Sequence, residues 1–357
     1  MVGGGTPDTT VKSYWGGDIQ WFTPSEIGKN KYVDFSLRTI TRDGLDNSSA
    51  KLLPLHTILL SSRATVGECS IASNECTTNQ GFQSLIAKQC NIDFLYYLIQ
   101  TKKKDLIRNA CGSTFLEISA NEIRKIKVAV PVQNEQEQIA KLLSLIDERI
   151  ATQNKIIEDL KKLKSAIVDK LYSSAKGETY SFRQLFEVVN EKNKKLIYSN
   201  VLSASQELGM IERSDINIDI KFEQNSISEY KIVRKGDYVV HLRSFQGGFA
   251  FSDRTGICSP AYTILHPNDL VAYGYLSHFF ISKPFIKSLK LVTYGIRDGR
   301  SINVDEWLDM TVTLPTKREQ SHILAIINAI DNKLHNENQI HNYMFRQRTY
   351  LLKTMFI

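Results

Sequence analysis

The side chains best suited to chemistry in this sequence gather in glycine-containing segments of both halves. Arginine, asparagine and glutamine can pair with the edges of guanine and adenine, each pair giving about 1–3 kcal/mol of discrimination. Serine, threonine and glycine-turn amides suit phosphate oxygens. The candidates in the first half are Ser62, Arg63, Thr65, Asn79, Gln80, Gln83, Ser113 and Thr114. Those in the second half are His241, Arg243, Ser244, Gln246, Arg297, Arg300 and Ser301.

Composition alone leaves a second interpretation of these segments open, in which they are solvated loops of an α/β domain. Signs of catalysis are missing from the sequence. It has no phosphate-binding Gly-x-x-x-x-Gly-Lys-Ser/Thr loop, no Gly-x-Gly-x-x-Gly, no His-Glu-x-x-His and no Gly-x-Ser-x-Gly. The Asn/Asp-Pro-Pro-Tyr/Phe box of amino-methyltransferases is also absent. The seven histidines show no ligand spacing and the five cysteines form no Cys-x-x-Cys pair, so we expect neither a metal nor a catalytic residue.

An internal repeat indicates which elements hold these segments. The first copy opens at Pro131 and the second at Pro315, and every matched pair keeps this same separation, the repeat offset. The matched residues are Pro131, Glu135, Gln136, Ile139, Ile146, Asp147, Asn154 and Ile156 with Pro315, Glu319, Gln320, Ile323, Ile330, Asp331, Asn338 and Ile340. A period this long indicates a duplicated half-protein rather than a solenoid. We therefore expect pseudo-two-fold symmetry and a target in two parts.

Each copy continues as a long helix with a coiled-coil seam, because apolar residues recur at alternating steps of three and four from Leu143 and from Ile327. Two seam positions are polar in both copies: Gln153 with Glu337, and Lys164 with Arg348. In an antiparallel pair whose facing residue numbers sum to 501, Lys164 faces Glu337 and Gln153 faces Arg348. We predict this register. The alternative is that these polar side chains extend to solvent.

The segments before each helix are predicted to form mixed α/β lobes, and both lobes are predicted to end in the same kinds of element. Ser119 with Glu122, and Asn303 with Glu306, predict short capped helices. Strands are expected next, at 126–130 and 310–314. The expected fold is two α/β (α+β) lobes separated by two long antiparallel coiled-coil helices. The boundaries are 1–130 for the first lobe, 131–174 for the first helix, 175–314 for the second lobe and 315–357 for the second helix.

The connector at 174–188 has no counterpart before Met1. We expect either that the termini meet without it or that the start site lies within a longer parental frame. The net charge of +7 permits nucleic-acid binding without establishing it. No segment is apolar enough to cross a membrane and no secretory signal opens the chain, so a cytoplasmic location is expected.

Several motifs together resemble the specificity subunit of type I restriction-modification systems. They are GGTPDTTVKSYWGGDIQWFTPSEI near the start, LLSSRATVGECSI followed by TTNQGFQSL, the closing GSTFLEISANEIRKIKVAVP, and the two PxxxEQxxI helix starts. The resemblance covers nearly the whole chain. The second lobe departs from it, since YGIRDGRSI replaces the GSTFLEIS form, so half-site sequences cannot be transferred.

The resemblance implies a non-catalytic subunit whose lobes each read one half of a split, asymmetric site in double-stranded DNA. It also implies that the helices hold the lobes apart and dock two modification subunits. Those methyltransferase subunits would carry S-adenosylmethionine and flip the target adenine out of the stack. Restriction subunits, which translocate on DNA with ATP and Mg²⁺, would join them. This chain itself would carry no cofactor and would not associate with a membrane.

Two other functions are weighed against this one. A self-sufficient DNA-modifying enzyme would need a cofactor or metal constellation that the sequence lacks, and methylation by the isolated chain would favour it. A coiled-coil scaffold that binds only protein would give no sequence-specific DNA protection in complex with its methyltransferase.

The ruler role of the helices gives the first prediction. Four residues inserted into one helix lengthen it by about 6 Å at 1.5 Å per residue, close to two base-pair rises of about 3.4 Å. We expect the insertion to change the unread spacer and to leave both half-sites intact. Methylome sequencing measures both, and an unchanged spacer would contradict the ruler role.

Overall fold

The structure is a computed structural model that describes residues 1–112, 116–205, 208–213, 224–241, 248–294 and 301–356. The chain divides into two compact units, each built from a lobe and a part of both long helices. The first unit comprises Met1–Asn154 and Gln339–Ile357, and the second comprises Lys155–Asn338. Within the described ranges, no helix combines the length and the apolar character that crossing a membrane requires.

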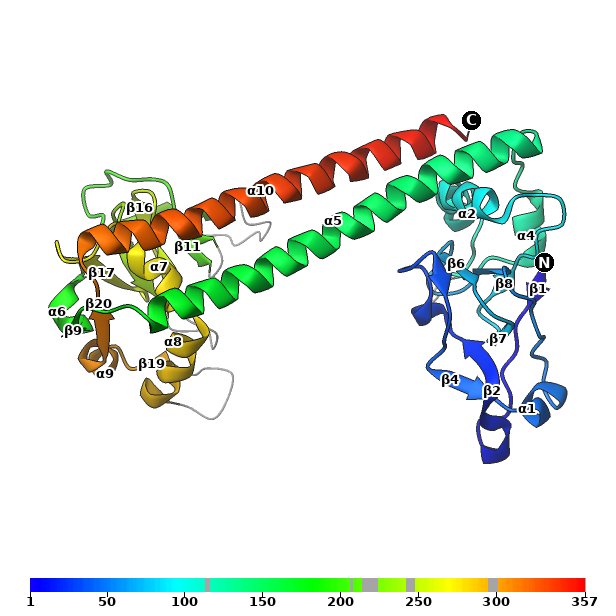
Figure 1. The fold of residues 1–357 in the computed structure, drawn as a ribbon, viewed down its shortest axis with the longest axis horizontal. Helices are drawn as coiled ribbons and strands as arrows, with labels where there is room; N and C mark the ends of the chain where they lie inside the picture. The colour runs from blue at the N-terminus through cyan, green and yellow to red at the C-terminus, as the bar shows by residue number, and fades with distance from the viewer. Residues whose placement is uncertain (113–115, 206–207, 214–223, 242–247, 295–300, 357) are drawn as a thin grey trace. The chain divides into compact units, whose positions relative to one another are not determined.

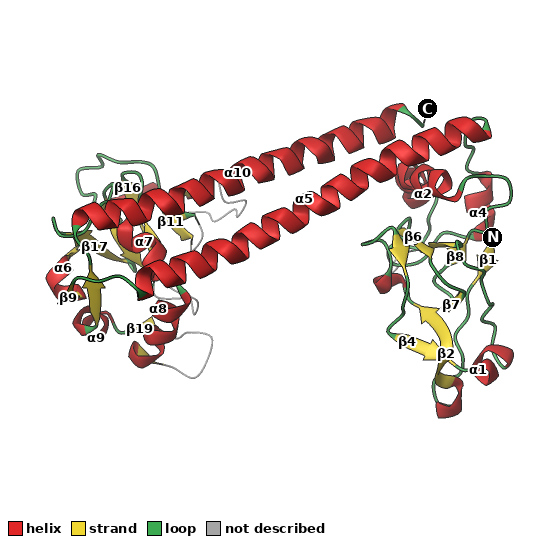
Figure 2. Ribbon diagram, in the orientation of Figure 1, coloured by secondary structure: helices red, strands yellow, loops and turns green. Residues whose placement is uncertain are grey.

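The first lobe is built from short strands and short helices (Figures 1 and 2). Strands β2, β4 and β7 form one sheet, β3, β5 and β6 form another, and β1 pairs with β8. The elements are β1 (Val2–Gly3), β2 (Trp15–Phe22), β3 (Tyr32–Val33), β4 (Arg38–Ile40), α1 (Arg42–Asp46), β5 (Ile58–Leu60), β6 (Cys69–Ala72), β7 (Cys76–Thr78), β8 (Gln83–Ser84), α2 (Ile92–Thr101), α3 (Lys103–Arg108) and α4 (Ala120–Lys125).

The second lobe has the same mixed character, with a four-stranded sheet in the order β10-β17-β14-β15. Its elements are β9 (Glu178–Ser181), α6 (Phe182–Leu185), β10 (Phe186–Val189), β11 (Leu202–Ser205), β12 (Gly209–Glu212), β13 (Lys231–Val233), β14 (Tyr238–Val240), β15 (Phe249–Phe251), β16 (Gly256–Cys258), β17 (Thr263–Pro267), α7 (Tyr275–Phe280), α8 (Lys283–Ser288), β18 (Thr293–Tyr294), β19 (Ser301–Ile302), α9 (Val304–Asp309) and β20 (Thr311–Leu314). An aromatic core fills it, in which Phe182 stacks on Trp307 with ring centroids 4.4 Å apart.

The two predicted long helices are present as α5 (Gln133–Ser173) and α10 (Lys317–Thr354). The predicted capped helices are confirmed as α4 and α9, where Ser119 and Asn303 accept the backbone N–H of the glutamate three residues on. The strand predicted at 310–314 is confirmed as β20, which pairs with β9. The strand predicted at 126–130 is wrong, because this segment has no strand partner among the described residues.

A buried glutamine joins the second lobe to the start of α10. The Gln320 side chain is fully buried. Its Oε1 accepts the backbone N–H of Ala272 at 2.7 Å, and its Nε2 donates to the carbonyls of Leu270 at 2.9 Å and Pro315 at 2.8 Å. A primary amide accepts through its oxygen and can donate two hydrogen bonds through its nitrogen. Gln320 therefore pairs backbone groups that burial would otherwise leave unsatisfied.

The first unit repeats this arrangement with Gln136, the residue that matches Gln320 in the repeat. Gln136 Oε1 accepts the N–H of Asn91 at 2.9 Å, and Nε2 donates to the carbonyl of Pro131 at 2.8 Å. An aromatic contact adds to the joint, because Phe94 of α2 stacks on Phe356 at 5.1 Å. The lobe is thus held by the beginning of α5 and by the end of the chain.

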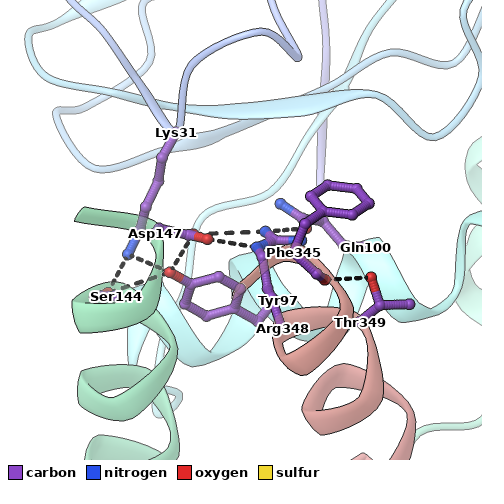
Figure 3. A network of polar contacts seen from close by, with 8 residues as sticks. All are labelled: Lys31, Tyr97, Gln100, Ser144, Asp147, Phe345, Arg348 and Thr349. Atoms are coloured by element: carbon purple, nitrogen blue, oxygen red, sulfur yellow. Dashed lines mark hydrogen bonds and ion pairs between the residues drawn. The ribbon is translucent and has the colours of Figure 1, made fainter. Parts of the chain in front are cut away.

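An ion pair between the two helices completes the joint in the first unit (Figure 3). Arg348 of α10 binds the Asp147 carboxylate of α5 and donates to Gln100 at 3.0 Å. The Tyr97 hydroxyl donates to the same carboxylate at 2.8 Å, and burial raises the pKa of Tyr97, so the phenol stays protonated. Lys31 of the lobe donates to Ser144 of α5 at 2.6 Å.

The second unit has the matching ion pair, Lys164 to Asp331 at 2.5 Å. At the repeat offset Asp147 matches Asp331 and Lys164 matches Arg348, so the repeat preserves the pair while lysine replaces arginine. Burial and the nearby Lys164 lower the pKa of His278 on α7 to about 4. His278 is therefore neutral at neutral pH and adds no charge beside the pair.

These pairs confirm that the helices are antiparallel within each unit but show that the predicted register is wrong. In the first unit, Ala140 of α5 lies in the same apolar cluster as Phe356, and further along α5 Asp147 binds Arg348. From Phe356 back to Arg348 of α10, the residue number of the contact therefore decreases while the number on α5 increases, as in an antiparallel pair. Lys164 binds Asp331 rather than Glu337, which stands six residues further on, about 9 Å along the helix. Arg348 likewise binds Asp147 rather than Gln153. Facing numbers sum to 495, because the long basic side chains reach carboxylates that flank the seam.

We expect Gln320→Leu to destabilise the second unit. Leucine fills a similar volume but leaves buried backbone groups unpaired, at about 1–3 kcal/mol for each group. The predicted loss is at least about 2 kcal/mol in the free energy of unfolding, followed in urea by the fluorescence of the buried Trp307. The control is Gln347→Leu on an exposed face of α10, with a change below about 0.5 kcal/mol. Equal effects of the two substitutions would contradict the role of Gln320.

Candidate nucleic-acid interface

Two loops that carry predicted residues meet in the first lobe, together with a third segment. The loops follow β5 (residues 61–67) and β7 (79–82), and the third segment is the described stretch 116–118 before α4. Ser62 ties them together, since its N–H donates to the Gly81 carbonyl at 2.8 Å and its carbonyl accepts the N–H of Ile118 at 2.9 Å. The sequence predicted the loops at 61–67 and 79–82 separately, and the structure brings these two together.

Within the loop after β5, Arg63 is the residue best placed to contact a ligand. Its side chain is 47% exposed, and its Nε lies 3.8 Å from the Glu117 carboxylate, a loose pair that competes weakly with another acceptor. Ser62 is buried, so its side chain supports the loop from inside the lobe. Thr65 is exposed, with its hydroxyl 3.0 Å from that of Ser61.

The loop after β7 is held against the glycine-rich start of the chain. Asn79 Oδ1 accepts the N–H of Gly81 at 2.9 Å, and Gln80 Oε1 accepts the Thr6 hydroxyl at 2.5 Å. A Cβ on Gly4 would lie 1.9 Å from the Asn79 carbonyl oxygen, so only glycine allows this approach. Gln83 lies on β8, beside β1.

In the second lobe only part of the prediction can be placed. His241 directly follows β14, and its N–H donates to the Gly248 carbonyl at 2.7 Å. Burial lowers the pKa of His241, so its ring is neutral at neutral pH. Ser301 lies on β19 opposite Tyr294. The other predicted residues of both lobes lie outside the described ranges: Ser113, Thr114, Arg243, Ser244, Gln246, Arg297 and Arg300.

The structure also brings forward a cation that the sequence analysis missed. The guanidinium of Arg38, on β4, stacks on the Trp15 ring at 3.6 Å and lies 5.5 Å from the Trp21 ring. Arg38 is exposed and has no ion pair among the described residues. Stacking on a flat ring holds a guanidinium in place and leaves its N–H edge free. Because the residues meet only through the pairing of β2 with β4, sequence spacing could not show this contact.

The stacked arginine is connected to the loops through the start of the chain. Trp15 Nε1 donates to the Asp8 carbonyl at 3.1 Å, and Asp8 stands two residues beyond Thr6, which holds Gln80. Among the described residues, no three His, Cys, Asp or Glu side chains come together as a metal site would require. The arrangement therefore offers hydrogen-bond donors and positive charge on a polar surface.

Comparison with known proteins shows the family of the chain. The family described as type I restriction modification DNA specificity domain matches residues 2–162 and again 177–343. The chain is 39% identical over 171 residues to the type I restriction enzyme MjaIX specificity subunit of Methanocaldococcus jannaschii, covering 46% of this chain and 39% of that protein. It is 29% identical over 194 residues to the EcoR124I/EcoR124II specificity subunit of Escherichia coli, covering 50% and 47%. The chain thus spans less than half the length of these two curated relatives.

Solved structures share the fold along the whole chain. One is the S subunit of a type I restriction-modification system from M. genitalium, with a TM-score of 0.53, 16% identity and 99% coverage of both chains. Another, from work on complex assembly and conformational transition of the type I R-M system, has a TM-score of 0.66 at 12% identity and covers 99% of this chain and 94% of that one. Because the family match extends over both lobes, the chain belongs to the type I restriction modification DNA specificity family.

Proposed function

We propose that this chain is the DNA sequence-specificity subunit of a type I restriction-modification complex. Each lobe reads one half of a bipartite, asymmetric site in double-stranded DNA. The observation that carries the proposal is the meeting of two polar loops in the first lobe, where Arg63, Asn79 and Gln80 stand on a single surface region tied by Ser62. These side chains are the types that read base edges.

The contrast between the two lobes supports unlike half-sites. The glutamine joint and the interhelical ion pair recur between matched residues of the repeat, whereas the loop sequences do not. Loops carry specificity where a scaffold is shared. This contrast favours two different DNA-reading surfaces, one on each lobe, that are attached to the long helices in the same way.

The chain is proposed to be non-catalytic and to act through partners. Two modification subunits would bind S-adenosylmethionine and methylate the flipped base, and restriction subunits would supply the ATP- and Mg²⁺-dependent steps. In the first unit, Leu142 and Leu145 of α5 are exposed beside Met344 of α10, and they line a groove of about 620 Å³. An exposed apolar groove on the helices suits a protein partner. The helices are proposed to set the length of the unread spacer.

Replacement of Arg63 tests the proposal. In the complex with its modification subunits, Arg63→Ala is expected to weaken binding to the target by about 10–100-fold, equivalent to about 1–3 kcal/mol, and to relax one position of one half-site. Affinity is measured on oligonucleotides with each base varied in turn, after methylated-base mapping has given the site.

The matched control is Arg183→Ala in the second unit, which removes an exposed arginine that is already paired with Asp309. Both half-sites should be read as before. Unaltered affinity and base preference in the Arg63 variant would remove this residue from the interface. Equal losses in both variants would contradict a specific role.

Arg38 is expected to bind a DNA phosphate, because its guanidinium is exposed and held on a rigid aromatic support. Arg38→Ala should weaken binding about equally for all sequences. It should also reduce the magnitude of the slope of log affinity against log salt concentration by about 1, as expected for the loss of one phosphate contact. The control is Arg42→Ala on α1, an exposed arginine 3.4 Å from the Asp46 carboxylate. An unchanged salt slope, or a changed base preference, would contradict the phosphate contact.

A further inference from the structure

One loop of the second lobe holds two apolar side chains in solvent. It comprises residues 193–198, between β10 and β11, and we call it the lysine loop. Leu196 and Ile197 of this loop are 63% and 65% exposed. Keeping both in water forgoes the stabilisation that burial of apolar surface normally gives. The question is whether the loop is unconstrained or is built to present them.

The lysine loop is constrained by the buried amide of Asn193. This residue is 1% exposed, its Nδ2 donates to the Tyr198 carbonyl at 2.7 Å, and its Oδ1 accepts the Tyr198 N–H at 3.2 Å. The Asn193 carbonyl accepts the N–H of Leu196 at 2.9 Å, and the Asn193 N–H donates to the Tyr230 carbonyl at 2.9 Å. One residue thus closes the loop and attaches it to the segment before β13. Leu196 and Ile197 therefore lie on a fixed support.

The backbone of the loop is strained at Leu196, whose φ of 53° lies in the left-handed region that leucine rarely adopts. Such a residue persists only where its surroundings hold it, and residues of this kind gather at functional sites. Ala64 is another non-glycine residue with a positive φ, and it directly follows Arg63 in the loop proposed to read bases. A loop that is merely solvated would gain nothing from this strain.

The charges of the lysine loop favour an anionic ligand. Lys194 and Lys195 stand at its turn, are exposed and form no ion pair with another described residue. The two carboxylates beside the loop, Glu191 and Glu229, are already paired with basic side chains at 2.6 Å. Uncompensated positive charge beside exposed apolar side chains fits a polyanion that also offers apolar surface. Stacked base pairs between two rows of phosphates are such a ligand.

We propose that the lysine loop is an apolar wedge that enters the minor groove of the half-site read by the second lobe. Leu196 and Ile197 insert at one base step and partly unstack it, while Lys194 and Lys195 bind the flanking phosphates. Unstacking costs least at the flexible TA and CA/TG steps, so the wedge selects sequence by its deformability and not by hydrogen bonds to base edges. The inference rests on the proposed function and adds a specificity-determining element outside the polar loops.

The test uses the full chain in complex with its modification subunits, after methylated-base mapping has given the site. Target duplexes carry 2-aminopurine at one position at a time, because the fluorescence of this base rises when it is unstacked. We expect a rise of about twofold or more at one step apart from the methylated adenine, where the base is flipped. A mismatch placed at this step lowers the cost of unstacking and should tighten binding about threefold.

The wedge variant is Leu196→Ala with Ile197→Ala. It should lose the fluorescence rise, weaken target binding about tenfold and gain nothing from the mismatch. The matched control is Val188→Ala with Leu270→Ala, which shortens two exposed apolar side chains of the same lobe that each follow an exposed acidic residue. The control should bind and unstack the target like the unaltered chain.

The lysines are tested separately. Lys194→Ala with Lys195→Ala should reduce the magnitude of the slope of log affinity against log salt concentration by about 2, as expected for the loss of two phosphate contacts. An unchanged slope would contradict the phosphate contacts.

Leu196→Gly separates DNA binding from folding. Glycine adopts a positive φ without strain, so the thermal midpoint should stay the same or rise. Target binding should nevertheless weaken about threefold, because part of the wedge is gone. A fall in the thermal midpoint together with the loss of binding would assign Leu196 a structural role and contradict the inference.

Two further results would overturn the inference. One is a wedge variant that binds and unstacks the target like the unaltered chain. The other is a wedge variant that binds its modification subunits more weakly in sedimentation without DNA, which would assign the loop to a protein partner. Failure of the proposed function is distinguishable from both, because the unaltered complex would then show no sequence-specific binding at all.

Discussion

The structure depends most on the buried amide of Gln320 and its counterpart Gln136. A glutamine at this place satisfies backbone groups of the lobe and of the proline segment at once, and each hydrogen bond fixes the lobe against the first turn of a long helix. The interhelical ion pair then fixes the second helix against the first. Neither lobe has its full support from one helix alone. The end of α10, from Gln339 on, is in consequence a structural part of the first unit.

Much of this architecture could be predicted from the sequence. The prolines, the glutamate-glutamine motif and the apolar stripe predicted both long helices, and the capping residues predicted α4 and α9. The register could not be predicted from the seam positions alone, because the ion pairs that align the helices use residues beside the seam. Asp147 and Asp331 follow seam isoleucines and lie at the flank, where long basic side chains reach them. The local sequence pattern predicts the helices, whereas the reach of the long basic side chains determines the register in which the two helices pair.

The failed strand at 126–130 has a different cause. Its alternating valines have the propensity for a strand, but a strand exists only when another pairs with it. The second lobe has β9 for this purpose, and the described part of the first unit has nothing comparable. Arg38 on Trp15 is a similar case, since the pairing of β2 with β4 creates the contact. The loop residues of the first lobe could be named from composition, but their meeting through Ser62 could not.

These observations separate the residues that hold the lobes on the long helices from the residues proposed to contact DNA. Repeated residues make the joints, and the residues that differ between the halves make the polar loops. The central claim is that two unlike loop surfaces on one repeated scaffold read two unlike half-sites. Methylated-base mapping in cells that express this chain with its modification subunits tests it most directly. The account predicts one motif made of two different half-sites separated by a fixed unread spacer. A single continuous motif, two identical half-sites, or methylation by the chain without its partners would contradict it.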